Sequence, residues 1–278
     1  MSRFLLLRGD KAAMLALVFL VAFGLAAALS PIWVGDDALE LNFDRRLSPP
    51  LGCYIMGTDP LGRCLMSRVF IAARTSLALS LIVVALSAAF GSTLGLAAGY
   101  LGGWPDALAT SAVDAAMGFP ALLLAMAAMY ILGPSVPNMV AVLTFSRWIL
   151  FARVARAEAM RLKQAGYVEA SRAAGAADGW VMRKHVLPGM AGVLATLAAM
   201  EVAGVMLSES TLTFLGMGIQ PPDVSLGLLV AQGKEYMNSA PWLVLFPGLV
   251  VFLLAMSFCV LANWLAVAME PAQRWRLR

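Results

Sequence analysis

The chain has 278 residues, of which 61% are hydrophobic and only 13% are charged. Soluble domains carry about a quarter charged residues, and the mean hydropathy of +0.83 also argues against a soluble protein. We therefore expect an all-α integral membrane protein in contact with lipid. The net charge of +4 does not indicate a nucleic-acid partner, because the basic residues flank apolar runs and form no aromatic-interleaved patch.

The first predicted span covers residues 12–29, after a basic tail that contains Arg3, Arg8 and Lys11. This apolar run is long enough to cross a bilayer. A basic start, an apolar run and small residues at 26–28 would also fit a secretory signal. The further apolar runs that follow favour a retained span.

Residues 30–74 are predicted to form a polar loop, so that residues 1–75 make up the tail, the first span and this loop. Two glycines and a proline favour a compact bend at its centre, which reads Gly57-Thr58-Asp59-Pro60-Leu61-Gly62-Arg63. Cys53 and Cys64 lie in the same loop. They could form a disulfide if the loop is extracytoplasmic, or remain two separate thiols.

Three more spans are predicted at 76–100, 107–132 and 136–152. Gly91, Gly95 and Gly99 recur on one face of the second span, a spacing that lets helices pack closely. Asp106 and Asp114 lie near the start of the third. A carboxylate there is either interfacial, where the helix dipole favours it, or part of a salt bridge.

A polar, basic stretch at 153–188 interrupts the apolar pattern. Glu169 suits the positive end of a short helix, Gly175 is a probable helix terminator in the left-handed conformation, and Asp178 could N-cap a second helix. Pro188 marks the start of the next segment. The stretch is either an amphipathic connector or a smooth surface for another protein. Its candidate contact residues are Tyr167, Glu169, Ala170, Ser171, Ala174, Gly175 and Asp178.

The fifth span is predicted at 189–207 and the sixth at 241–267. Glu201 inside the fifth either faces a translocation path or is a paired structural carboxylate, and pairing is favoured. In the loop between these spans, the run from Phe214 to Pro222 predicts irregular backbone because of its Gly and Pro residues.

Six spans place both termini on one side of the membrane. Fourteen of the 20 Lys and Arg residues lie in the amino tail, in the stretch 147–184 and in the carboxyl tail. The positive-inside rule therefore predicts that both termini and the Glu169 stretch are cytoplasmic.

Catalytic and metal chemistry find no support in the sequence. No GxxxxGK[ST] motif occurs, the three cysteines form no CxxC, and His185 is the single histidine. No nucleophile–base pair is visible. We expect no catalytic residue, no metal site and no cofactor bound by this chain.

Four motif clusters resemble those of ABC importer permeases of the dipeptide, oligopeptide and nickel class. The Glu169–Gly175 stretch followed by Leu187-Pro188 resembles their EAA loop. The bend at 57–63 resembles their LGTDxxGRD signature, with Met56 for Leu and Cys64 for the last Asp. The run 99–120 is similar except for Ser111, where an Arg is usual, and Phe214–Pro222 resembles FLGLGxQPP.

The resemblance implies a type I importer permease fold, with a core at 76–271 and a basic tail at 272–278. It implies a cytoplasmic coupling helix that docks on an ATPase subunit. It also implies that the protein lies in the bacterial inner membrane. The implied partners are a second homologous permease, two ATPase subunits that carry ATP and Mg, and an extracytoplasmic substrate-binding protein. Implied signature or gating residues are Gly57, Thr58, Asp59, Gly62, Arg63, Asp114, Glu201, Phe214, Gly216, Gln220 and Pro221.

Two other classes remain as alternatives. An ion-coupled transporter or channel would need coupling carboxylates in mid-span, for which Glu201 is the one good candidate. A lipid-modifying membrane enzyme would need a cluster of reactive side chains at one membrane face, which the sequence does not suggest.

Overall fold

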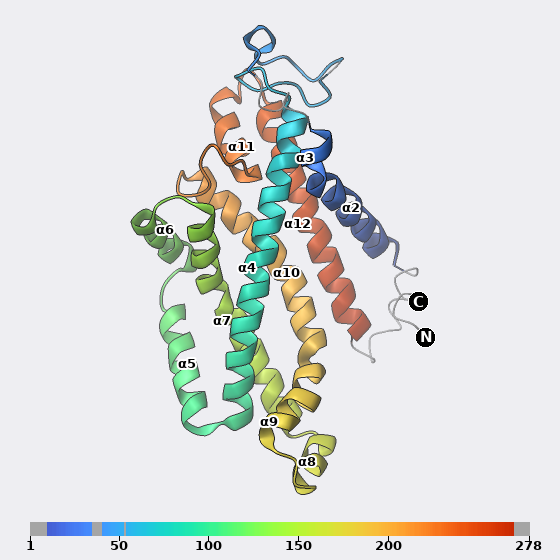
Figure 1. Cartoon of the computed structure of the whole chain (residues 1–278), viewed down its shortest axis with the longest axis vertical. Coiled ribbons are helices and arrows are strands. Elements are labelled where there is room, and N and C mark those ends of the chain that lie inside the picture. Colours follow the sequence, from blue (N-terminus) through green and yellow to red (C-terminus); the bar gives the residue numbers. More distant parts are fainter. Residues whose placement is uncertain (1–9, 35–40, 53, 270–278) are drawn as a thin grey trace.

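The computed structural model describes residues 10–34, 41–52 and 54–269, and these form an elongated bundle of helices (Figure 1). Among the described residues there is no strand, only two isolated β-bridges in the loop that precedes the longest helix. The all-α expectation is confirmed. Arg3 and Arg8 of the amino tail, the carboxyl tail 272–278, and Cys53 lie outside the described residues.

The described helices follow the predicted order. They are α2 (Lys11–Ala28), α3 (Ser30–Trp33), α4 (Leu65–Leu101), α5 (Gly103–Met117), α6 (Ala121–Leu132), α7 (Val136–Lys163), α8 (Gly166–Ala173), α9 (Asp178–Val181), α10 (Leu187–Phe214), α11 (Leu226–Gly233) and α12 (Trp242–Met269). Short 3-10 turns lie at Phe43–Arg45 and Lys234–Tyr236, and a π-helical turn lies at Met182–Val186. Within the described ranges, five helices are long and apolar enough to cross a membrane, or six if α5 and α6 count as one span.

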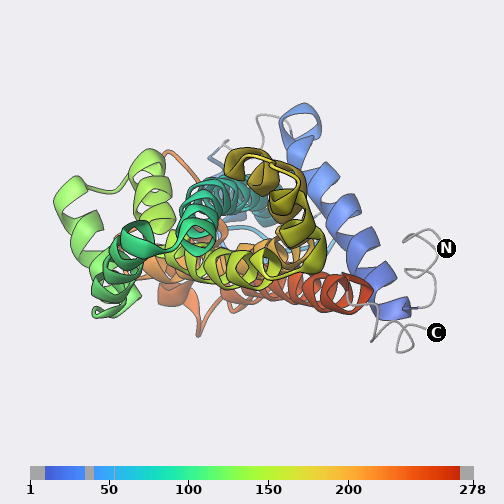
Figure 2. The ribbon, with the colours of Figure 1, turned by 90° about the horizontal axis from the view of Figure 1, so that it is seen from below.

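The two ends of the bundle differ in content (Figure 1). One end carries α8 and α9, and we call it the α8 end. The other carries residues 41–64 and α11, and we call it the loop end. Figure 2 looks onto the bundle from below, with the α8 end nearest the viewer.

The predicted glycine face is the contact between α4 and α7. A Cβ on Gly91, Gly95 or Gly99 would overlap the carbonyl oxygens of Trp148, Ala152 and Arg156 respectively. The two backbones can approach this closely only because these positions have no side chain. The small-residue prediction is therefore confirmed.

Several of the predicted spans are shorter than the observed helices. Helix α4 begins at Leu65 rather than near residue 76, since Arg68 is buried in a salt bridge and no longer signals an aqueous loop. Helix α10 continues to Phe214 and, through the π turn, is continuous back to Asp178 over 37 residues. Helix α7 likewise continues to Lys163.

The predicted span at 107–132 is not one continuous helix. The chain bends by 82° between α5 and α6, at the break that contains Pro120. A proline has no backbone N–H and disfavours the helical conformation of the residue before it. This is the physical reason for the break.

Candidate functional site

Helix α8 ends in a complete glycine cap. Gly175 has a left-handed φ of +88°, and its N–H donates to the Arg172 carbonyl at 2.9 Å, while the Ala176 N–H donates to the Ser171 carbonyl at 3.1 Å. These two bonds are the Schellman pattern that satisfies the last carbonyls of a helix. The predicted terminator is confirmed.

One side of α8 holds it to the bundle and the rest is exposed. Val168 is fully buried in a cluster that includes Tyr100 and Met190. On the outer side, Tyr167 and Trp180 are about half exposed. The residues with small or no side chains in this segment are also exposed, namely Ala170, Ala173, Ala174 and Gly175. The segment thus presents small and aromatic side chains to its surroundings.

His185 supports this surface from within. Its ring makes edge contacts with Tyr167 and Trp180, at centroid distances of 5.8 and 5.2 Å, and its Nε2 lies 3.2 Å from Ser171 Oγ. The single histidine therefore connects α8 to the turn that leads into α10. Sequence reasoning gave this residue no role.

Asp178 does not cap α9, contrary to the prediction. It is the first residue of α9, and the N-cap position belongs to Ala177. Its carboxylate instead accepts a hydrogen bond from the Tyr100 hydroxyl of α4 at 3.0 Å and lies 3.7 Å from Arg172 Nε. Lys163 Nζ donates to the Tyr100 carbonyl at 2.6 Å. These bonds fix the α8 end to the longest helix.

At the loop end, Asp59 is the centre of the predicted bend. Its buried carboxylate accepts from the backbone N–H groups of Leu61 and Arg63 at 2.8 and 2.9 Å. It also accepts from Arg63 Nε and Arg68 Nη1, each at 2.7 Å. Arg68 in turn donates to Gln232 of α11 at 3.3 Å. One carboxylate thus joins the loop, α4 and α11.

The glycines of this bend are needed for their left-handed backbone conformation and because a side chain at these positions would not fit. Gly57 and Gly62 both have φ of +77°, and a Cβ on Gly62 would overlap the Asn42 carbonyl. Thr58 accepts from the Trp242 indole N–H through its carbonyl at 3.3 Å. The compact bend is confirmed, and it is tied to α12.

Cys64 occupies the N-cap position of α4 without a side-chain hydrogen bond to the helix. An Asp at this position would accept from the first helical N–H groups, which a thiol does poorly. Cys64 is a free thiol in the structure.

The Phe214–Pro222 run begins with a second glycine cap. Gly216 has φ of +83°, its N–H donates to the Thr213 carbonyl at 2.9 Å, and the Met217 N–H donates to the Leu212 carbonyl at 3.0 Å. A cavity of about 410 Å³ lies between this run and the bend at 57–63, and it brings Arg63 together with Phe214, Gly216 and Gln220. Two segments about 150 positions apart in the chain therefore meet.

The other two predicted residues lie elsewhere. Asp114 borders a cavity of about 280 Å³ with Arg153 and Arg156, while Asp106 forms the ion pair with Arg156 through two bonds of 2.5 and 2.7 Å. Glu201 accepts from Arg147 Nη1 at 3.1 Å. The pairing predicted for Glu201 is confirmed, as is a salt bridge for Asp106.

Glu209 is the site residue that sequence reasoning missed. It is fully buried in α10. Among the described residues it has no cationic partner within salt-bridge distance. It accepts instead from four hydroxyl groups, those of Ser76 at 3.2 Å, Ser210 at 3.4 Å, Thr213 at 2.9 Å and Ser225. Hydroxyl residues one and four positions after Glu209 were the available signal, but the predicted loop at 208–240 hid it.

Three of these hydroxyl groups also accept a hydrogen bond from a backbone N–H group. Ser76 accepts from the N–H of Leu226 and Ser225 from that of Leu228, both at 3.2 Å, and Thr213 accepts from that of Ile219 at 3.3 Å. The carboxylate of Glu209 therefore orders the whole return from α10 to α11. Four hydroxyl groups thus converge on one buried carboxyl group.

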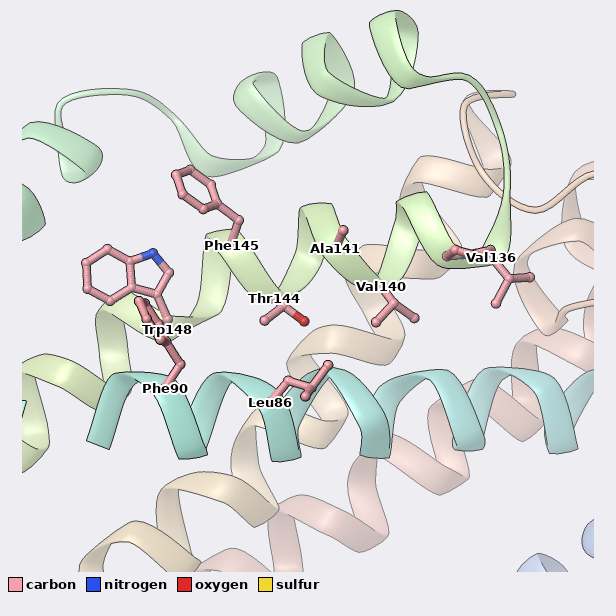
Figure 3. Close-up of a pocket in the computed structure, with 9 residues that line it drawn as sticks. Leu86, Phe90, Val136, Val140, Ala141, Thr144, Phe145 and Trp148 are labelled. Carbon is pink, nitrogen blue, oxygen red and sulfur yellow. The ribbon is translucent and has the colours of Figure 1, made fainter. Parts of the chain in front are cut away.

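An apolar groove of about 580 Å³ runs between α4 and α7 (Figure 3). Phe90 and Trp148 meet across it with ring centroids 5.5 Å apart, and Phe145 lies exposed along α7. The indole N–H of Trp148 is covered and has no hydrogen-bond partner within the described chain. A groove of this composition suits a lipid chain or a neighbouring helix.

A bundle of helices long and apolar enough to cross a membrane, with an exposed, glycine-capped segment at one end, defines a multi-pass membrane protein. The chain belongs to the family of binding-protein-dependent transport system inner membrane components, whose sequence model matches residues 91–275. It is an inner-membrane permease of the ABC importer class, as its resemblance implied.

Characterised relatives span nearly the whole chain. The chain is 32% identical to the dipeptide transport system permease protein DppC of Alkalihalophilus pseudofirmus over 96% of its own length and 88% of the relative. It is 33% identical to DppC of Haemophilus influenzae, over 94% and 91% of the two chains. It is also 33% identical to the glutathione transport system permease protein GsiD of Pectobacterium atrosepticum, over 85% and 78%.

Proposed function

We propose that the chain is one of two membrane subunits in an importer that takes up peptides or a related small solute. The relatives named above carry dipeptides or glutathione, which is itself a peptide, and this supports a peptide cargo over a nickel chelate. The remaining partners in this proposal are a second homologous permease, two ATPase subunits and an extracytoplasmic substrate-binding protein. ATP and Mg belong to the ATPases.

The exposed surface of α8 carries the proposal. In it, the α8 end faces the cytoplasm and docks on an ATPase, which agrees with the basic residues gathered there. The proposal also assigns both chain termini to the cytoplasm, as the positive-inside rule predicts. The loop end then faces the substrate-binding protein. Small side chains at Ala170, Ala173 and Ala174 let a partner groove approach the helix closely.

One continuous helical stretch can carry a movement of the α8 end to the loop end. The helical stretch Asp178–Phe214 has 37 residues and spans about 55 Å at a rise of 1.5 Å per residue. Asp178 and His185 fix its first turns to α4 and α8, and Glu209 fixes its last turns to α11. Movement of α8 by an ATPase would therefore displace the loop end, which is the geometry that alternating access needs.

An ion-coupled transporter is not favoured by a specific observation. The candidate that the sequence offered, Glu201, is already paired with Arg147.

The two glycine caps allow a matched test. Gly175→Asp and Gly216→Asp introduce the same side chain at the same left-handed cap, with nothing within 4 Å of either new Cβ, and Asp tolerates this conformation better than most residues. We expect both variants to be inserted and folded. In co-purification from detergent, Gly175→Asp should lose the ATPases and transport, while Gly216→Asp should keep the ATPases.

Two outcomes would contradict the proposal. One is normal recovery of ATPases and normal uptake with Gly175→Asp. The other is a wild-type chain that purifies alone as a homo-oligomer, after which neutralisation of Glu201 would be the next test for ion coupling.

A further inference from the structure

We propose that the cavity at the loop end, bounded by Arg63, is a carboxylate-binding site that receives the terminal carboxylate of the peptide cargo. This inference rests on the proposed function, because it takes a peptide as cargo. It assigns a ligand contact within the permease itself, in addition to any recognition by a binding protein.

The cavity has the size of a small-solute site. Its volume of about 410 Å³ falls within the range of about 300–1,000 Å³ typical of ligand pockets. Its polar side chains come from three segments, the bend, α4 and the α10–α11 region. They are Arg63, Arg68, Thr213, Gln220, Gln232, Glu235 and Tyr236.

Arg63, Arg68 and Asp59 together leave a positive excess at the edge of the cavity that the bend forms. Asp59 is the common partner of Arg63 and Arg68. A single carboxylate between two guanidinium groups leaves a net charge of +1. The side chain of Asp59 is 2% exposed and that of Arg68 is 6% exposed, whereas that of Arg63 is 18% exposed. The accessible part of this excess is therefore at Arg63.

The free donors of Arg63 have the right geometry for a carboxylate. Asp59 holds its Nε at 2.7 Å, and neither Nη group donates a hydrogen bond to any other described residue. The two Nη groups of a guanidinium can bind both oxygens of a carboxylate side by side. Because Asp59 fixes the guanidinium plane through Nε, this fork is held in place before a ligand arrives.

Glu235 gives the same cavity an acidic edge. It is exposed and borders the cavity, and within the described chain no cation lies within salt-bridge distance of it. A peptide zwitterion carries both charges, so Arg63 and Glu235 offer partners of opposite sign for its two ends. A concave site of this kind fits a small solute better than a flat protein surface.

The test uses the assembled permease–ATPase complex without its binding protein, and dialanine as the probe. Binding is followed by saturation-transfer NMR, with dialanine amide as the uncharged comparison. We expect dialanine to bind and the amide to bind about tenfold more weakly, because a charge-assisted pair is replaced by a neutral contact. Arg63→Gln should weaken dialanine binding to the level of the amide.

Two further variants make the result specific. Arg46→Gln removes the same charge from an exposed position in the same loop that does not border the cavity, and it should leave dialanine binding unchanged. Glu235→Gln removes a negative charge from the edge of the cavity that receives the carboxylate of dialanine. It should therefore increase the preference for dialanine over its amide by about twofold to threefold. This variant does not touch the Asp59 network, so it stays informative if Arg63→Gln fails to fold.

Equal binding of dialanine and its amide, or equal loss with Arg63→Gln and Arg46→Gln, would overturn the proposal. So would a loss of binding-protein docking in the absence of cargo with Arg63→Gln, because the carboxylate would then belong to that protein. The permease–ATPase complex is recovered before the probe is added, so a failure of probe binding can be told from a failure of the importer assignment.

Discussion

The chain uses the same glycine cap at two opposite places, and the surroundings of the two caps differ. After Gly175 the chain stays exposed, and the last turn of α8 lies bare on the surface. After Gly216 the chain folds back, so that Ile219 is 1% exposed and a Cβ on Gly218 would overlap Thr213. The local backbone motif is therefore not what distinguishes the two ends.

The two ends differ in how far residues of the chain itself cover their surfaces and bind their polar groups. The loop end is completed by its own residues through the buried carboxylates of Asp59 and Glu209. The α8 end is fixed from behind by Val168, Asp178 and His185, but its outer surface has no cover within the described chain. A complete end is expected to be sensitive to substitution in its stability, and an uncovered end in its assembly with partners.

The largest expected effect on stability is at Gly62. Gly62→Ala places a Cβ into the Asn42 carbonyl at a left-handed φ, and we expect it to destabilise the fold by about 3 kcal/mol or more. Thermal unfolding in detergent and the yield of monodisperse protein measure the loss. Gly52→Ala is the matched control, because it has φ of +66° but nothing within 4 Å, and it should cost only about 1 kcal/mol.

A smaller loss is expected at Glu209. Glu209→Gln replaces one carboxyl oxygen by an amide nitrogen, whose two N–H donors face hydroxyls that already accept backbone N–H bonds, so we expect a loss of about 2 kcal/mol. Ser76→Ala removes one of the four donors and should cost about 1 kcal/mol. If the Gln variant unfolds at the same temperature as the wild type, the hydrogen-bonded role given above to the Glu209 carboxyl group is wrong.

The smallest effect on stability is expected on the α8 surface. Tyr167 and Trp180 are about half exposed, and replacing both by Ala should change unfolding by no more than about 1 kcal/mol while sharply reducing the recovery of ATPases. Phe43→Ala, which removes an exposed aromatic at the loop end, should change neither. Normal ATPase recovery with the double variant would remove the α8 surface from the docking account.

The sequence predicted the features that depend on local chemistry. The glycine face of α4, the terminator at Gly175 and the compact bend at 57–63 each follow from residues close together in the chain. The features it missed depend on distant partners. Asp178 meets Tyr100, which lies 78 positions away, and Glu209 is ordered by Ser76, 133 positions away.

Buried charge also misled the boundary predictions. Arg68 was assigned to a polar loop, but Asp59 compensates it inside α4. Pro120 was visible in the sequence, yet its consequence, an 82° bend instead of a small kink, depends on where α5 and α6 pack. Charge and proline mark probable interruptions, and only the three-dimensional contacts decide whether an interruption occurs.

The most direct test of the contrast between the two ends is site-specific photo-crosslinking in the assembled importer. A photoreactive phenylalanine derivative would replace Ala174 on the α8 surface in one chain and Ile55 at the loop end in another, both exposed positions. The account predicts a crosslink from position 174 to an ATPase subunit and none to an ATPase from position 55. An ATPase crosslink from position 55, or its absence from position 174, would contradict it.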